Sequence, residues 1–501
     1  MSKHYDVAVL GGGVAAHATA AHLARRSWRV VVVGNGHRPW RYGYDGLSLG
    51  RRSFSLLAGA SPVFSRILSE IAQSQTFQRR ARALPSVQVL TPELRMDLPT
   101  DPAELSREIE REFPAARRLA LEVAAEITRT QAAGDAAFRE DAVWPPGGFW
   151  ERRETARFVA SLSQEGGAEA LVAELPKDHA LRRILEAPPR FASHRATSGA
   201  LSPFAFARLF AAWTRELAEL PNGEDEALEL FRDRVRAHGG ELLLQEQVSK
   251  VVTKGSRVAG VELIGGGAFG VQFVVGESTS ADLLSLAPDC EPSRRALDAM
   301  PRVTPAEHRF VLSLLVRKEA LPAPLGREAF VLPAPPDAPL HLQRFDDDDT
   351  SLLVVETLVS KPWPADVMRE RLLAILEDHL PFLTRHLLVV DSVHDGRPLW
   401  DFRGGTRKDV ERVLLRNSGG VSSAEPMAPL YDVSPSRLLD LAGDDVRVPV
   451  GNAFVVGPSV LPALGQEGEL LSAWSVARII TRTDRRKEKM RREMWSKIEL
   501  R

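Results

Sequence analysis

The sequence predicts an α/β protein that begins with a strand, a helix and a second strand and contains a helix-rich α+β part later in the chain. Residues 5–10 form a short apolar run, residues 11–13 are glycines, and residues 14–26 are rich in alanine. Four valines follow at 30–33. A buried strand, a glycine turn and a slender helix in this order are typical of a βαβ unit, whose parallel strands are covered by helices.

The composition is that of a globular protein. Its 501 residues are 44% hydrophobic and 26% charged, which is enough chain for two domains or one large composite domain. The formal net charge of −1 gives no overall field that favours nucleic acid as a partner. Cys290 is the only cysteine, which excludes an internal disulfide and suits a reducing cytoplasm. No run reaches the roughly 18 to 20 apolar residues that span a bilayer, and no signal peptide is recognisable, so we expect a cytoplasmic protein.

Helical and strand-like patterns alternate through the rest of the chain. Residues 101–190 are charged and helical in pattern, and an apolar stripe at helical spacing follows within 202–220. Residues 225–244 predict a helix and then a strand, and 248–276 predict several short strands separated by turn residues. The remaining candidates are strands at 309–316, 327–333 and 351–359, a helix at 368–383, and a strand, turn and helix over 451–480.

The glycine turn after the first strand matches the pattern G-x-G-x-x-A. The first glycine allows a tight strand-to-helix turn, the second lets backbone amides approach a pyrophosphate, and the small third residue lets the helix pack closely on the strand. The helix N-terminus adds partial positive charge. We therefore predict that a dinucleotide is bound by Gly11, Gly13, Val14, Ala15 and Ala16.

Two further segments, together with the glycine turn, resemble the phytoene desaturase-like and amine oxidase-like FAD-dependent oxidoreductases. In GGELLLQEQVSKVVTKGSRVAGVEL, Val248 matches the valine whose backbone contacts adenine in that family. The segment VGNAFVVGPSVLPALGQEGELLSAWSVARII matches the family's C-terminal strand, the loop that crosses the flavin, and the helix that points its N-terminus at the isoalloxazine. The resemblance implies cofactor contacts from Gly457, Pro462, Gly465, Glu467 and Gly468.

The resemblance also implies an architecture: a Rossmann-like, glutathione-reductase-like FAD/NAD(P)-binding domain assembled from separated segments, with a helix-rich α+β substrate domain. The expected boundaries are residues 1–60, 222–300 and 436–480 for the nucleotide-binding domain, 61–221 and 301–435 for the substrate domain, and 481–501 for a C-terminal tail.

Members of this family desaturate, saturate or isomerise lipophilic isoprenoids, carotenoids above all. The resemblance therefore implies FAD as the cofactor, a lipophilic, isoprenoid-like small molecule as the substrate, and hydride transfer at flavin N5. Because the flavin carries the chemistry, no acid–base motif is required and the sequence identifies no catalytic residue. The histidines show no metal-ligand spacing, so no metal site is predicted.

One position departs from the family pattern. The acidic residue that holds the ribose belongs at position 34, which is glycine. Three interpretations follow. Asn35 or a backbone group replaces the acid and FAD is retained; or His37 and Arg38 accept the 2′-phosphate of NADP; or the fold is retained, the cofactor is lost, and a non-catalytic descendant acts through protein interactions.

The C-terminal tail is basic and amphipathic. Residues 481–501 hold nine Lys or Arg against four Asp or Glu, and Met490, Met494, Trp495 and Ile498 share one helical face. Such a helix suits an anionic membrane surface, here the inner face, or a partner protein, while a solvated extension explains the pattern equally well. Peripheral membrane association is therefore an open expectation.

Overall fold

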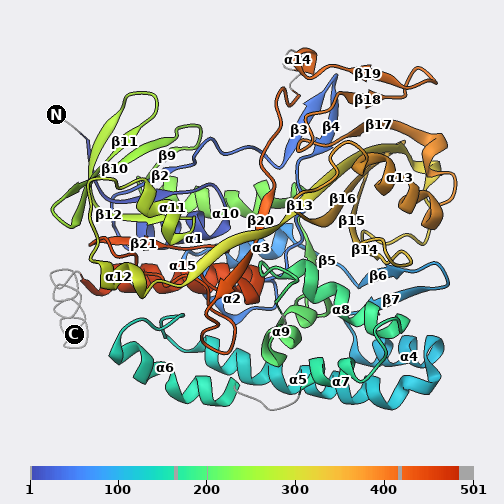
Figure 1. Cartoon of the computed structure of the whole chain (residues 1–501), viewed down its shortest axis with the longest axis horizontal. Helices are drawn as coiled ribbons and strands as arrows, with labels where there is room; N and C mark the ends of the chain where they lie inside the picture. Colours follow the sequence, from blue (N-terminus) through green and yellow to red (C-terminus); the bar gives the residue numbers. More distant parts are fainter. Residues whose placement is uncertain (1–2, 163–166, 200, 416–419, 484–501) are drawn as a thin grey trace.

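A computed structural model describes residues 3–162, 167–199, 201–415 and 420–483, and it contains two large sheets with helices packed against both (Figure 1). Among these residues, no helix is both long and apolar enough to cross a membrane. The basic tail predicted for 481–501 lies, from residue 484 onward, outside the described residues. The mixed α/β class expected from the sequence is confirmed.

The smaller sheet gathers strands from distant parts of the chain. Its order is β10-β11-β12-β1-β2-β9, with β21 beside β12. From β21 through β12, β1 and β2 to β9 the strands run parallel, whereas β10 and β11 form antiparallel pairs at the edge. The strands are β1 (His4–Leu10), β2 (Val30–Val33), β9 (Glu241–Leu243), β10 (Val248–Lys254), β11 (Arg257–Leu263), β12 (Ala268–Gly276) and β21 (Ala453–Val455).

Helix α1 (Val14–Arg25) is central to this part of the molecule. It packs against both α10 (Gly223–Ala237) and α15 (Gly465–Thr483). Its alanines are buried, and their small side chains allow the helices and the sheet to approach closely. The three helices share one apolar cluster with the parallel strands. The N-terminus of α1 therefore has a fixed position at the carboxyl end of β1.

The larger sheet carries the second part of the fold. Its order is β19-β18-β17-β13-β16-β15-β14-β6-β7, with β20 beside β13. Helix α13 covers one face, and α8 and α9 cover part of the other. The strands are β6 (Ser86–Leu90), β7 (Arg95–Pro99), β13 (Arg302–Arg317), β14 (Glu328–Val331), β15 (Leu340–Asp346), β16 (Thr350–Ser360), β17 (Leu387–Asp391), β18 (Leu399–Asp401), β19 (Lys408–Val410) and β20 (Ala428–Ser434).

Helices α4 to α9 lie in the lower part of Figure 1, below the two sheets. A short hairpin, β3 (Arg41–Tyr44) and β4 (Leu47–Gly50), packs on the larger sheet. The domain boundaries expected from the sequence stay a prediction. The other elements are α2 (Pro62–Glu70), α3 (Ser74–Arg80), β5 (Arg82–Ala83), α4 (Pro102–Glu112), α5 (Arg117–Arg139), α6 (Phe149–Leu162), α7 (Ala168–Ala173), α8 (Ala180–Ala192), α9 (Pro203–Thr214), β8 (Ala218–Glu219), α11 (Ser280–Ser285), α12 (Arg294–Asp298), α13 (Met368–His379) and α14 (Arg412–Leu415).

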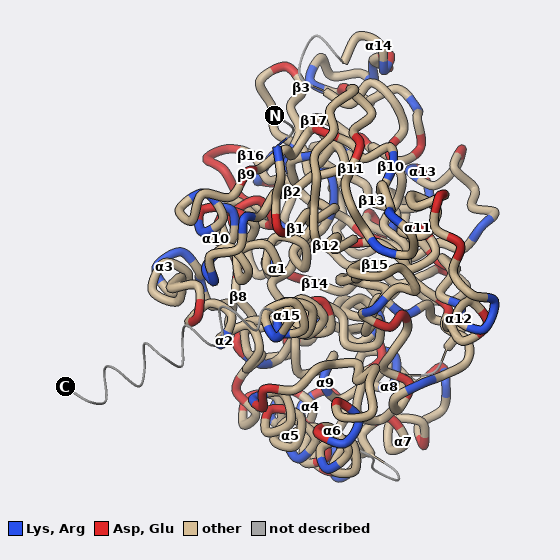
Figure 2. Tube along the Cα trace, turned by 90° about the vertical axis from the view of Figure 1, so that its left-hand side faces the viewer, with Lys and Arg blue, Asp and Glu red and all other residues tan. Residues whose placement is uncertain are grey.

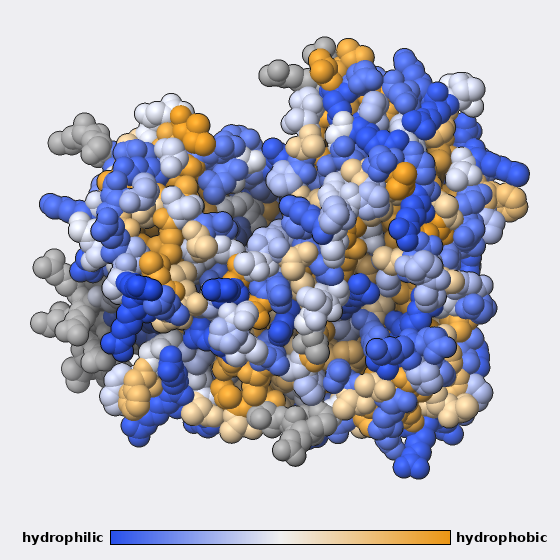
Figure 3. Space-filling view, viewed as in Figure 1, coloured by the Kyte–Doolittle hydropathy of each residue, from blue (hydrophilic) through white to orange (hydrophobic). Residues whose placement is uncertain are grey.

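The surface matches the near-zero net charge. Basic and acidic residues are interspersed along the chain in Figure 2. The face seen in Figure 3 is largely hydrophilic, with apolar side chains in small groups. The view in Figure 2 therefore shows no large patch of a single charge sign.

A fully buried ion-pair network ties the end of the larger sheet together. Arg369 of α13 donates to Asp395 at 2.7 Å, and Arg412 donates to Asp391 at 2.7 Å. The side chains of Arg369, Asp391 and Asp395 are completely buried. The hydroxyl of Tyr42 in β3 donates to Asp391 at 2.7 Å, so the network also anchors the β3–β4 hairpin.

Arg369→Ala is expected to destabilise the protein by about 3–5 kcal/mol, because it removes from the buried Asp395 carboxylate the cation that donates to both of its oxygens. Urea unfolding of the variant and the parent chain measures the difference. The matched control is Arg371→Ala on the same helix, whose partner Asp337 and whose own side chain are both largely exposed. That change is expected to cost at most about 1 kcal/mol. Equal costs for the two variants would contradict the assigned role of the network.

Candidate functional site

The glycine turn lies where three parallel strands of the smaller sheet end. Gly11 follows β1, and Gly13 caps the N-terminus of α1. Glu277 follows β12, the neighbour of β1, and Gly457 lies two residues beyond the end of β21. Val14, Ala15 and Ala16 form the first turn of α1, as the sequence predicts. The glycine turn and the helix N-terminus expected from the sequence are therefore present, with the chain's own carboxyl group beside them.

The carboxylate of Glu277 binds the backbone amides that would face a pyrophosphate. The Gly13 amide donates to Oε2 at 2.5 Å, and the Ala16 amide donates to Oε1 at 3.1 Å. A Cβ atom on Gly13 would lie 2.7 Å from the same carboxylate, so the contact also requires glycine there. An anion at a helix N-terminus is favourable, and Glu277 supplies that anion from within the chain.

The environment of Glu277 raises its pKa to about 7. Burial is the largest cause, because a low-dielectric surrounding disfavours the charged form, and the nearby charge of Glu469 adds to it. The amides of Gly13 and Ala16 act in the opposite direction but do not outweigh burial. The carboxyl group therefore titrates near neutrality while it caps the helix.

The ribose end of the predicted site is filled by backbone. A Cβ atom on Gly34 would lie 2.4 Å from the carbonyl oxygen of Leu244, so no acidic side chain fits at this position. The Gly34 amide donates to the carbonyl of Leu243 at 3.0 Å. Gly34 is required by the close approach of the segment that follows β9, which explains the departure from the family pattern.

The adenine end is also occupied by contacts within the chain. The Val248 amide donates to the side-chain oxygen of Asn35 at 3.3 Å. His37 packs against Gly12, and its Nε2 lies 2.9 Å from a guanidinium nitrogen of the buried Arg232. Arg38 forms an ion pair with Glu425 at 3.3 Å. The residues predicted to hold an FAD ribose, an adenine or an NADP phosphate thus already have protein partners.

These contacts test whether FAD fits the residues present. Its pyrophosphate would meet the Glu277 carboxylate in place of free amides. Its ribose would meet Leu244 in place of an acid at position 34. In this arrangement the residues do not fit the cofactor. Within the described part of the chain there is also no group of three or more His, Cys, Asp or Glu arranged to hold a metal.

The C-terminal loop and helix predicted from the sequence are present. Pro462 lies in the short helical turn at Pro462–Leu464, directly before α15. Close packing requires glycine at positions 465 and 468. A Cβ atom on Gly465 would lie 2.1 Å from the carbonyl oxygen of Ala192, and one on Gly468 would lie 2.3 Å from the carbonyl oxygen of Leu461. These positions bring α15 against its neighbours.

Glu467, which the resemblance placed at the flavin, has a different environment. Its Oε2 accepts from the buried Arg208 at 2.9 Å, and its Oε1 accepts from Ser61 at 2.8 Å. Arg208 also pairs with Asp135 at 2.7 Å. The side chain belongs to a buried ion-pair network and does not line the central cavity described next.

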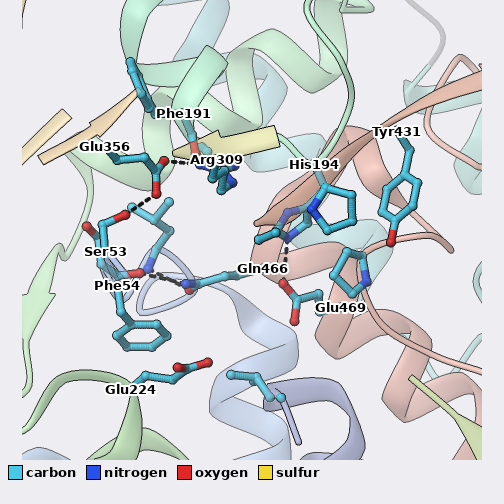
Figure 4. Close-up of a pocket in the computed structure, with 18 of the residues that line it drawn as sticks. Ser53, Phe54, Phe191, His194, Glu224, Arg309, Glu356, Tyr431, Gln466 and Glu469 are labelled. Atoms are coloured by element: carbon cyan, nitrogen blue, oxygen red, sulfur yellow. Dashed lines mark hydrogen bonds and ion pairs between the residues drawn. The ribbon is translucent and has the colours of Figure 1, made fainter. Parts of the chain in front are cut away.

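A cavity of about 380 Å³ lies between the glycine turn and the larger sheet (Figure 4). This size falls within the range of small-molecule sites. Gly13 and Val14 line it, whereas Asn35 and Val248 do not. Its charged and hydrogen-bonding lining residues are Ser53, Ser55, His194, Glu224, Glu277, Ser278, Arg309, His341, Glu356, Tyr431, Ser459, Gln466 and Glu469.

Paired side chains hold the lining in place. His194 Nε2 lies 2.6 Å from Glu469 Oε1, and Figure 4 shows this pair facing the cavity. Arg309 pairs with Glu356, which also accepts from Ser53. Gln466 accepts from the Leu57 amide at 2.9 Å and donates to the Ser55 carbonyl at 2.7 Å. The hydroxyl of Tyr431 is kept protonated, because burial and nearby carboxylates raise its pKa.

Sequence reasoning did not identify Glu277 or His194. Glu277 lies 264 residues from Gly13, and only the pairing of β12 with β1 brings the two together. The available signal was an acidic residue immediately after an apolar strand, FVVGES, in a protein with a nucleotide-type fold. His194 follows the end of α8, and we find no local signal that marks it.

Known structures share the fold. An oxidoreductase from Methanosarcina mazei has a TM-score of 0.60 at 14% identity, covering 94% of this chain and all of that one. Cyclohexylamine oxidase from Brevibacterium oxydans has a TM-score of 0.53 at 14% identity, covering 97% and 99%. A RAB GDI from Plasmodium falciparum has a TM-score of 0.52 at 9% identity, covering 95% and 98%. No protein-family model and no curated protein matches the sequence.

The chain therefore shares the fold of these proteins, a Rossmann-like parallel sheet joined to a second part with a large sheet and many helices, as the sequence predicts. At these identities the likeness shows the fold alone. A RAB GDI among the similar structures is not named as an oxidoreductase, so activity has to be argued from the site. The narrower phytoene desaturase-like assignment stays a prediction.

Glu277→Ala is expected to raise the affinity of the glycine turn for pyrophosphate. Removing the carboxylate frees the Gly13 and Ala16 amides, and hydrogen bonds from such groups to an anion change affinity by roughly tenfold or more. Calorimetric titration with inorganic pyrophosphate measures the gain over the parent chain. Glu262→Ala, on the exposed side of β11, serves as the control. Equal pyrophosphate affinity in all three proteins would show that Glu277 does not block the site.

Glu277→Gln is expected to change how stability depends on pH. The folded pKa of about 7 lies above the ordinary 4.5, so the stability that the protonated carboxyl gives is lost as pH rises between these values. The free energy of unfolding of the variant relative to the parent should therefore rise between pH 4.5 and pH 8, by an amount on the order of 2 to 3 kcal/mol. Other groups cancel in the difference. A difference that is constant with pH would contradict the raised pKa.

Proposed function

We propose that this protein is a non-redox binding protein built on the flavin-oxidoreductase fold. In this proposal the chain's own groups occupy the positions where a dinucleotide would bind, and the central cavity binds a small molecule. The observation that carries the proposal is the Glu277 carboxylate on the amides of Gly13 and Ala16. Function would then come from binding a ligand or a partner.

Electrostatics supports this proposal. A pyrophosphate beside Glu277 and Glu469 would bring like charges together. Two like unit charges at about 4 Å cost about 4 kcal/mol in surroundings of intermediate dielectric. Gly34 and Leu244 remove the ribose contact independently, because backbone fills the space of the missing acid. Two separate contacts thus disfavour the same cofactor.

The second candidate function is the FAD-dependent oxidoreductase that the resemblance implies, acting as a desaturase, saturase or isomerase on a lipophilic substrate. The fold, the glycine turn and the cavity beneath α15 favour it. A carboxyl group with a pKa of about 7 is also half protonated at neutral pH, which weakens its hold on the amides. The lining is mixed, because the carboxyl groups of Glu224, Glu277, Glu356 and Glu469 stand among apolar side chains such as Leu57, Phe191 and Trp213.

The remaining predictions about partners and location are not decided by the described residues. A lipophilic substrate, a cytoplasmic location, and contact with an inner membrane face or a partner protein through 481–501 stay predictions.

The visible spectrum of the purified chain tests the choice between the two functions. We expect a colourless protein that releases no flavin on heating and shows no saturable uptake of added FAD, measured by flavin fluorescence. The reason is that the phosphate and ribose contacts are already made within the chain. Flavin bands in the purified protein, or stoichiometric uptake of FAD by the parent chain, would overturn the proposal in favour of the oxidoreductase.

A further inference from the structure

A second cavity, of about 350 Å³, adjoins the central one across residues 191–197. His194 lines the central cavity, and its neighbours Ser193 and Arg195 line the second. Arg195 forms a bridge to Tyr431 beside β13, and alternate side chains of an extended segment point to opposite sides. One strip of backbone therefore separates two sites of similar size.

Two arginines with unused donors line this second cavity. Arg190 lies in the last turn of α8, and its side chain makes no hydrogen bond or ion pair to any residue in the described ranges. Burial lowers its pKa, and the charges of Glu307 and Glu186 partly offset this. Arg195 donates to the Asp440 carbonyl at 2.9 Å, while its Nε is buried and has no partner among the described residues.

The rest of the lining combines apolar side chains with Ser193, Thr197 and two acidic residues. Glu169 and Glu186 line the cavity; Glu186 is exposed to solvent, where its charge is screened, and Glu169 is half-buried. Glu307 is already engaged, because it accepts from the Thr197 amide at 2.8 Å and from the Thr197 hydroxyl. The apolar wall consists of Val172, Pro189, Ala196, Leu201 and Phe206.

We propose that this second cavity binds an amphipathic organic carboxylate, with its carboxylate held by Arg190 and Arg195 and its apolar body against Leu201 and Phe206. A planar guanidinium matches a carboxylate through paired hydrogen bonds. The Nε of Arg195 is a buried donor without a partner among the described residues, and such donors are uncommon in folded proteins and mark places where a ligand completes the bonding. A free phosphate would leave the apolar wall exposed to water, which favours a carboxylate with a hydrocarbon body.

Calorimetric titration of the full chain with octanoate tests this proposal. We expect saturable binding with one site, and a loss of affinity of roughly tenfold or more in Arg190→Gln. Arg190 has no partner in the described residues, so this change removes a ligand contact without removing a contact that holds the fold. Arg195→Gln should lose affinity as well, with circular dichroism confirming that the variant is folded.

The matched control is Arg294→Gln, which removes one positive charge from a side chain that is 95% exposed and distant from the cavity lining. Its octanoate affinity should equal that of the parent chain. Three results would each overturn the proposal: no saturable octanoate binding, unchanged affinity in Arg190→Gln, or equal binding of octylamine. Inorganic phosphate that binds as tightly as octanoate would overturn the assigned ligand class. The outcome is independent of whether the protein binds FAD.

Discussion

The contact between the Glu277 carboxylate and the first amides of α1 is the interaction on which the rest of the site depends. A helix N-terminus at the end of a parallel strand offers unpaired amides and partial positive charge, for which an anionic group is a favourable partner. Glu277 does so from the neighbouring strand β12. The buried amides are thereby satisfied without a ligand, and a carboxyl group with a pKa of about 7 remains next to the central cavity.

Other contacts follow the same principle at the nucleotide end. Asn35 bonds to the Val248 amide, and Leu244 occupies the space of a side chain at position 34. Each of these contacts replaces one that a dinucleotide would otherwise make. Because they come from three different segments, a single substitution does not restore the whole cofactor site. The central cavity is built separately, by paired side chains such as His194 with Glu469 and Arg309 with Glu356.

Much of the fold could be predicted because it depends on local patterns. The βαβ unit, the strands near 309–316, 327–333 and 351–359, and the C-terminal helix were each indicated by apolar periodicity and glycine placement. The strands β6 and β7 and the short strands β17 to β19 were not indicated. They are brief, and the larger sheet stabilises them through pairing with distant strands. The same limit applied to Glu467, whose partner Arg208 lies far away in the sequence.

The sequence by itself determined the class of fold, the glycine turn, and the absence of an acid at position 34, because these depend on residue type and spacing along the chain. Only the tertiary structure decided what that absence means. It showed that backbone of Leu244 fills the position, and that Glu277, 264 residues from Gly13, occupies the phosphate cradle. The physical reason is that parallel strands bring segments that are distant in sequence together at one edge of the sheet. There the Glu277 carboxylate meets the free amides of the glycine turn, and the Leu244 backbone fills the space beside Gly34.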